Sequence, residues 1–191
     1  MLNTHGRSRI RCFPPVIATL ALVFSSAAFA QHYQQTDLVA NSTSVSSTAT
    51  IDANLVNAWG LSRASGSPWW VSDNGTGLST LYDGAGAIVP LVVTIPPPMG
   101  GTPPSAPTGT VYNFTGRFRL KPGKSSVFLF VTEDGTIAGW NPGVDPTNAV
   151  IKVDNSKQGA IYKGCAIAKH LTTARLYATN FATGTGGDVR R

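Results

Sequence analysis

The feature that most constrains the fold of this chain is an internal repeat. Three segments each open on a glycine and a short β-rich run, at intervals of about 50 residues. The segments are Ala58 to Ile95, Pro107 to Val153, and Tyr162 to Val189. Units of about 40–50 residues with several short strands are typical of propeller blades. The repeat therefore predicts a β-propeller in which Gly60, Gly109 and Gly164 begin the innermost strands.

Local composition supports strands throughout the repeats. VFLFV, AVIKV and PLVVTI are rich in β-branched and aromatic residues, and DGAG, EDGT and NPGVDP carry turn chemistry. The expected strands are Trp59–Ser62, Trp69–Ser72, Leu78–Tyr82 and Ile88–Ile95, then Gly109–Phe114, Ser126–Thr132, Thr136–Trp140 and Ala149–Val153, then Gly164–Lys169 and Leu176–Thr179. The prediction is an all-β fold, a partial β-propeller of about two and a half four-stranded antiparallel blades. Because an incomplete blade leaves an open edge, we expect the chain to be an N-terminal fragment of a longer protein.

The N-terminus predicts export. A basic region with three arginines precedes the apolar run from Val16 to Phe24, and the small residues Ala28 and Ala30 follow it. This is the layout of a signal peptide over residues 1–30, because the apolar run is shorter than a membrane-spanning helix requires. The mature chain is expected to have no transmembrane span and to lie in the periplasm, outside the cell or at its surface. Residues 31–53 form a polar segment, whose Thr36–Ala40 is a candidate closing strand, before the propeller domain of residues 54–191.

Charge and cysteine content limit the function classes. Without the leader, twelve basic residues face nine acidic ones, and they are scattered along the sequence. A nucleic-acid surface needs clustered basic residues, so no nucleic-acid partner is expected. Only Cys165 remains, in the apolar stretch KGCAIA, which excludes an internal disulfide and favours a buried, inert thiol.

Several of these motifs carry a resemblance. NLVNAWGLS, PWWVSDNGTGLSTLYDGAG, VTEDGTIAGWN, VDNSKQGAIYKGCAIA and LYATNF resemble an uncharacterised family of exported bacterial proteins, some with a PEP-CTERM sorting signal. Their repeats are similar to NHL-type six-bladed propellers. The resemblance implies a bacterial host, a longer parent protein and no established activity.

Polar residues at the strand ends form the candidate site. In an antiparallel four-stranded blade, the turns after the second strands and the connections into the first strands lie on one face. Asp73 and Asn74, Glu133 and Asp134, and Asn180 occupy such turns, and Asn57 precedes a first strand. We therefore expect Asn57, Asp73, Asn74 and Asp134 to surround one mouth of the channel and bind a ligand.

Two functional interpretations follow from this ring of polar groups. Carboxylate and amide oxygens suit hard cations such as calcium, so Glu133 and Asn180 are candidate metal ligands of a propeller-type metal-dependent hydrolase or lactonase. However, turns favour Asp and Asn without any ligand. The preferred interpretation is a non-enzymatic protein that binds a small molecule, a glycan or a protein partner. Four tryptophans could offer a carbohydrate platform, although packing between blades is the favoured role: Trp59, Trp69, Trp70 and Trp140.

Overall fold

The computed structural model describes residues 33–182 and 188–190. Every strand described below belongs to one compact unit, Thr36–Arg191. The expected signal peptide, residues 1–30, lies outside the described residues. Its cleavage after Ala30 stays a prediction.

The regular structure of the described residues is almost entirely β. A single 3-10 turn, η1 (Ser156–Gln158), accompanies the strands. Eight strands form one sheet in the spatial order β3-β4-β5-β6-β12-β11-β10-β7. Their bounds are β3 Ala58–Ser62, β4 Trp69–Asp73, β5 Leu78–Tyr82, β6 Ile88–Thr94, β7 Pro107–Tyr112, β10 Phe128–Thr132, β11 Thr136–Asn141 and β12 Asp145–Asp154.

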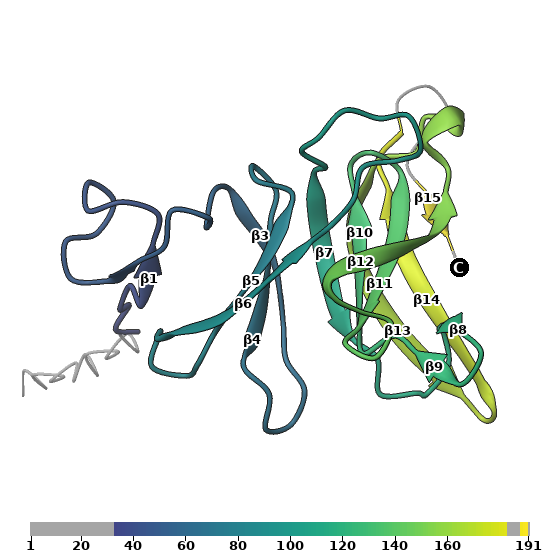
Figure 1. Ribbon diagram of the computed structural model, residues 1–191, viewed down its shortest axis with the longest axis horizontal. Helices are drawn as coiled ribbons and strands as arrows, with labels where there is room; N and C mark the ends of the chain where they lie inside the picture. The colour runs from purple at the N-terminus through teal and green to yellow at the C-terminus, as the bar shows by residue number, and fades with distance from the viewer. Residues whose placement is uncertain (1–32, 183–187, 191) are drawn as a thin grey trace, which may run out of the picture. The chain divides into compact units, whose positions relative to one another are not determined.

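This sheet consists of two antiparallel four-stranded meanders (Figure 1). Strands β3 to β6 form the first, and β7, β10, β11 and β12 form the second. They join through one parallel bridge between Thr94 and Asn148. The end strands β3 and β7 also contact one another, so the sheet nearly closes on itself. The predicted all-β class is confirmed, while the number of blades stays a prediction.

The remaining strands form three small sheets. Strands β13 (Tyr162–His170) and β14 (Thr173–Asn180) are an antiparallel hairpin, to which β15 (Asp188–Arg190) adds beside the end of β14. The sequence predicts two strands in the segment Tyr162 to Val189, and β15 adds a third. The stretch between β7 and β10 holds a hairpin of β8 (Arg119–Lys121) and β9 (Lys124–Ser125).

The N-terminal strand pairs locally. Only β1 (Val39–Ala40) of the expected closing strand forms, and it pairs in parallel with β2 (Thr50–Ile51). Strand β1 therefore pairs within the polar segment of residues 31–53 and does not join either meander.

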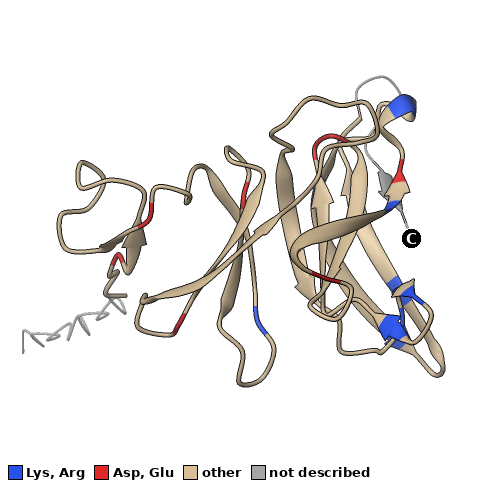
Figure 2. Ribbon diagram, viewed as in Figure 1, with Lys and Arg blue, Asp and Glu red and all other residues tan. Residues whose placement is uncertain are grey.

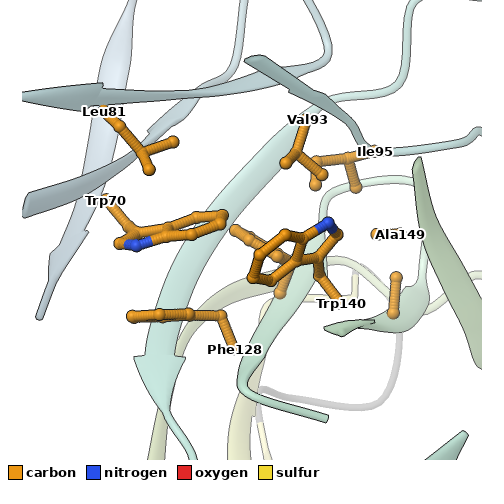
Figure 3. Packing of buried hydrophobic residues seen from close by; sticks show 9 residues of the cluster. Trp70, Leu81, Val93, Ile95, Phe128, Trp140 and Ala149 are labelled. Carbon is orange, nitrogen blue, oxygen red and sulfur yellow. The ribbon is translucent and has the colours of Figure 1, made fainter. Parts of the chain in front are cut away.

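An aromatic cluster packs the two meanders against each other. The Trp70 ring stacks on Phe128 with centroids 4.3 Å apart and lies 4.6 Å from Trp140 (Figure 3). Leu81 and Val93 complete this core from the first meander. Burial of such rings supplies much of the hydrophobic stabilisation, so Trp70 and Trp140 act as packing residues, as the sequence indicated.

Two glycines set the separation between β7 and the strands on either side of it, β3 and β13. A Cβ atom on Gly60 would lie 2.6 Å from the Thr110 nitrogen, and one on Gly109 would lie 2.7 Å from the Cys165 nitrogen. Real Cβ atoms do not approach backbone this closely. Strand β7 thus lies against β3 on one side and β13 on the other only because these positions lack side chains.

No helix of the described residues has the length and apolar character that crossing a bilayer requires.

Replacing Gly109 by alanine should strain the contact between β7 and β13. The backbone must shift to admit the methyl group, which we expect to lower the free energy of unfolding by about 1–3 kcal/mol. Gly84→Ala is the matched control, because a Cβ there meets no atom within 4 Å. Urea denaturation of both variants checks this. Equal, small effects would contradict the close approach.

Candidate functional site

Polar side chains from separate repeats meet near one end of β3, β7 and β13, the strands that carry the three repeat glycines. The Asn57 amide nitrogen donates to Asn74 Oδ1 at 2.9 Å, and Asn74 Nδ2 donates to Glu133 Oε2 at 2.8 Å. Glu133 Oε1 pairs with the Lys163 ammonium group. The structure therefore brings together three of the sequence-predicted residues. Ligand binding by them stays a prediction.

Lys163 is the member of this network that sequence reasoning missed. It lies on β13, one residue before Gly164, and its Nζ is 5.1 Å from the centre of the Trp59 ring. Trp59 holds the corresponding position, one residue before Gly60. Aligning the repeats on their glycines would have placed both side chains at equivalent positions on β3 and β13, the two strands that flank β7.

A groove of about 260 Å³ runs along these strands. Trp59 and Leu61 of β3, Thr110 of β7, and Lys163 and Cys165 of β13 line it, with the three glycines between them. Trp59 is 46% exposed, in contrast to the buried Trp70 and Trp140. One of the four tryptophans is thus placed where a ligand could stack on it.

The charges of the network are balanced. The hydrogen bond and charge of Lys163, together with the Asn74 amide, lower the pKa of Glu133 despite partial burial. Both side chains of the ion pair are about one third exposed. Glu133 is therefore ionised at neutral pH and neutralises Lys163, so the groove presents donors and acceptors without net charge.

Asp73 does not reach this groove. It is fully buried, and its Oδ2 accepts a hydrogen bond from the Thr80 hydroxyl at 2.8 Å. The Tyr82 hydroxyl lies between Thr80 Oγ1 and Asp52 Oδ2, at 2.9 and 2.8 Å. Desolvation, opposed by the Thr80 hydrogen bonds and reinforced by Asp52, raises the pKa of Asp73 to about 7. Asp73 is thus part of an internal polar chain, and the expectation that it faces the channel mouth is not met.

Asp134 and Asn180 bond to the backbone. Asp134 Oδ2 accepts from the Ala106 nitrogen at 2.7 Å. Asn180 Oδ1 accepts from the nitrogens of Ile161 and Ala182 at 2.9 and 3.2 Å. Both residues therefore hold connections in place, the role that turn chemistry assigns to Asp and Asn.

The oxygens predicted to bind a metal already have protein partners. Glu133 uses both carboxylate oxygens within the network, and Asn180 uses its amide oxygen on backbone nitrogens. Within residues 33–182 and 188–190, no group of three or more His, Cys, Asp or Glu side chains could hold an ion.

Cys165 lines the groove without being activated. Desolvation raises the pKa of its thiol to about 12. The neutral thiol is a weak nucleophile, which agrees with the inert thiol expected from the sequence.

Comparison with known proteins finds uncharacterized viral relatives. One protein of Acanthamoeba polyphaga mimivirus is 32% identical over 136 residues, covering 69% of this chain and 33% of the relative. A second protein of that virus is 33% identical over 135 residues, covering 68% of this chain and 34% of the relative. The chain therefore spans about one third of the length of these curated relatives. No protein-family model and no solved structure matches it.

The expected membership of an exported bacterial family with NHL-type repeats is wrong. The relatives are viral, and no family model supports such repeats. The motifs behind that resemblance combine a glycine-led strand with Asp, Asn or Gly at the following turn. Turn geometry favours these residues in antiparallel sheets generally, so the motifs indicate β structure and do not by themselves identify an NHL-type repeat.

The buried Asp73 predicts a pH-dependent stability. Since its pKa is raised from 3.8 to about 7, the folded state holds the proton more tightly than the unfolded state. The resulting stabilisation is complete below about pH 4 and is lost as the pH rises to about 7, by up to roughly 4 kcal/mol.

Asp73→Asn should flatten the free energy of unfolding across this pH range, measured by urea denaturation. The exposed Asp83, which caps the turn after β5, gives the control Asp83→Asn, which should retain the wild-type slope. An unchanged slope in Asp73→Asn would refute the assignment.

Proposed function

We propose that the chain is a ligand-binding part of a β-propeller, with two four-stranded blades and the inner strands of a third. In this proposal β3, β7 and β13 are the innermost strands and line the axis. The meander order, the contacts of β7 with both β3 and β13, and the close approach at Gly60 and Gly109 support it. Neighbouring blades would then pack through the aromatic core around Trp70.

We propose further that the groove binds a neutral, polyhydroxylated ligand such as a short glycan. The observation that carries this is the exposed Trp59 ring beside Lys163 in one groove, with Lys163 paired to Glu133. An aromatic face stacks on the apolar face of a sugar ring, while charged and amide groups bond its hydroxyls. Because Lys163 and Glu133 neutralise each other, a ligand without charge fits better than an ion.

The chemistry of the groove supports binding more than catalysis. The lowered pKa of Glu133 makes it a poor general acid, and the raised pKa of Cys165 makes it a poor nucleophile. No observation in the described part of the chain favours the metal-dependent hydrolase alternative.

Substitutions at Trp59 test the proposed glycan site. Neutral oligosaccharides of glucose and N-acetylglucosamine are titrated while intrinsic tryptophan fluorescence and amide NMR shifts are followed. Trp59→Ala should weaken binding about ten-fold or more, since a stacked ring contributes roughly 1–3 kcal/mol. Trp59→Phe retains an aromatic face and should lose far less.

Two controls separate binding from folding. Thermal melts of the Trp59 variants should stay close to that of the native chain, because the side chain is nearly half exposed. Ile88→Ala removes an equally exposed apolar side chain on β6 and should leave oligosaccharide binding unchanged. Equal affinity in Trp59→Ala and native protein would reject the site.

A further inference from the structure

A second, larger cavity lies apart from the groove. It has a volume of about 660 Å³ and is lined by residues of the β8 hairpin, of β10 to β13, and of the first half of β14. Pockets of about 300–1,000 Å³ are the usual size of small-molecule sites. No residue of this cavity belongs to the network around Glu133.

The walls of this cavity are mainly aliphatic. The aliphatic lining consists of Leu120, Leu129, Ile137, Val153 and Leu176. Leu120, Leu129 and Leu176 are buried, whereas Val153 on β12 remains 39% exposed. Such walls favour an apolar group that leaves water on binding.

Three cations lie at the rim. Arg119 of β8, Lys152 of β12 and Arg175 of β14 border the cavity. Lys152 Nζ donates to the Leu120 carbonyl oxygen at 3.2 Å. This hydrogen bond holds the ammonium group at one side of the cavity. Among the side chains described over residues 33–182, the structure shows no salt bridge from any of these three cations to a carboxylate.

The surroundings extend this positive charge. The β8–β9 hairpin region also carries Arg117, Lys121 and Lys124, and Figure 2 shows basic residues gathered on this hairpin and the strands beside it. The Arg117 guanidinium donates to the Thr172 carbonyl oxygen at 3.1 Å, which ties this region to the turn between β13 and β14. Residues 84–132 and 155–182 contain no acidic residue, and among the strands that line the cavity only β12 carries acidic residues, Asp145 and Asp154. The fold thus clusters charges that look scattered in the sequence, and their field attracts anions toward the cavity.

We propose that this cavity binds an amphiphilic anion. Its apolar chain lies between Leu129, Ile137 and Leu176, and its carboxylate, phosphate or sulfate group lies at Arg119 and Arg175. An anion without a tail would leave the aliphatic walls wet, and a cationic amphiphile would meet unpaired positive charge. A nucleic acid would use the rim but not the aliphatic walls.

Dodecanoate, below its micellar concentration, is the first probe. Calorimetric titration of the full chain should give one binding site, with affinity falling as salt is raised. Dodecyltrimethylammonium has the same tail with opposite charge, and acetate has the head group without the tail. Both should bind at least about ten-fold more weakly, because each lacks one of the two matched interactions.

Variants at the rim and in the walls test the two halves separately. The double variant Arg119→Gln/Arg175→Gln should weaken dodecanoate binding about ten-fold or more, since hydrogen bonds to charged groups are the strong ones. The control Lys121→Gln/Lys124→Gln removes two equal charges from the same hairpin region outside the cavity lining and should change affinity about two-fold or less. Val153→Trp should fill the cavity and abolish binding while the thermal melt is retained.

A second arm distinguishes a free acid from a lipid phosphate. Lauroyl lysophosphatidate and dodecanoate are compared with the same variants, and preferential binding of either one supports the site and identifies the source of the anion. Equal affinity for dodecyltrimethylammonium would overturn the proposal. So would equal losses in the two double variants, or binding that saturates only with many molecules per chain.

Discussion

The structure depends on the close approach of three backbones at Gly60, Gly109 and Gly164. At Gly60 and Gly109 there is no room for a Cβ atom, because the next inner strand occupies that space. This approach lets β7 contact both β3 and β13. It also sets Trp59 and Lys163, each one residue before its glycine, close enough for the ammonium group to lie over the indole ring. The groove is therefore formed by equivalent positions of the three repeats.

Burial and hydrogen-bond partners determine the pKa of the two acidic residues at the strand ends, Asp73 and Glu133. Asp73 lies at the end of β4 in the first repeat, and Glu133 follows β10 in the second repeat. Only Glu133 forms a salt bridge. Desolvation raises the pKa of Asp73, whereas Lys163 and Asn74 lower that of Glu133. Asp73 is thus a buried carboxyl with a raised pKa, whereas Glu133 is a partly exposed carboxylate with a lowered pKa. Both residues occupy similar turn positions in the sequence.

The sequence predicted the features that arise from local chemistry. The all-β class, most strand positions and the convergence of Asn57, Asn74 and Glu133 follow from β-rich runs ended by turn residues. Lys163 was missed because its role depends on a neighbouring strand, not on its own surroundings in sequence. The burial of Asp73 likewise depends on Thr80 and Tyr82, which lie across the sheet.

Other features depended on contacts between distant segments. The basic residues near β8 and β14 come together only in the fold, where Arg117 also donates a hydrogen bond to the Thr172 carbonyl oxygen, and no pattern along the chain indicates this. The family assignment failed for the opposite reason, since turn motifs recur in unrelated β proteins.

Proton–proton NOEs between the inner strands test the central claim most directly. The account predicts cross-peaks that join the Gly60 α-protons to Thr108–Thr110, and the Gly109 α-protons to Gly164 and Cys165. If the hairpin cross-peaks of β4–β5 and β13–β14 appear while these inter-strand peaks are missing, the three strands do not pack together and the proposed groove does not exist.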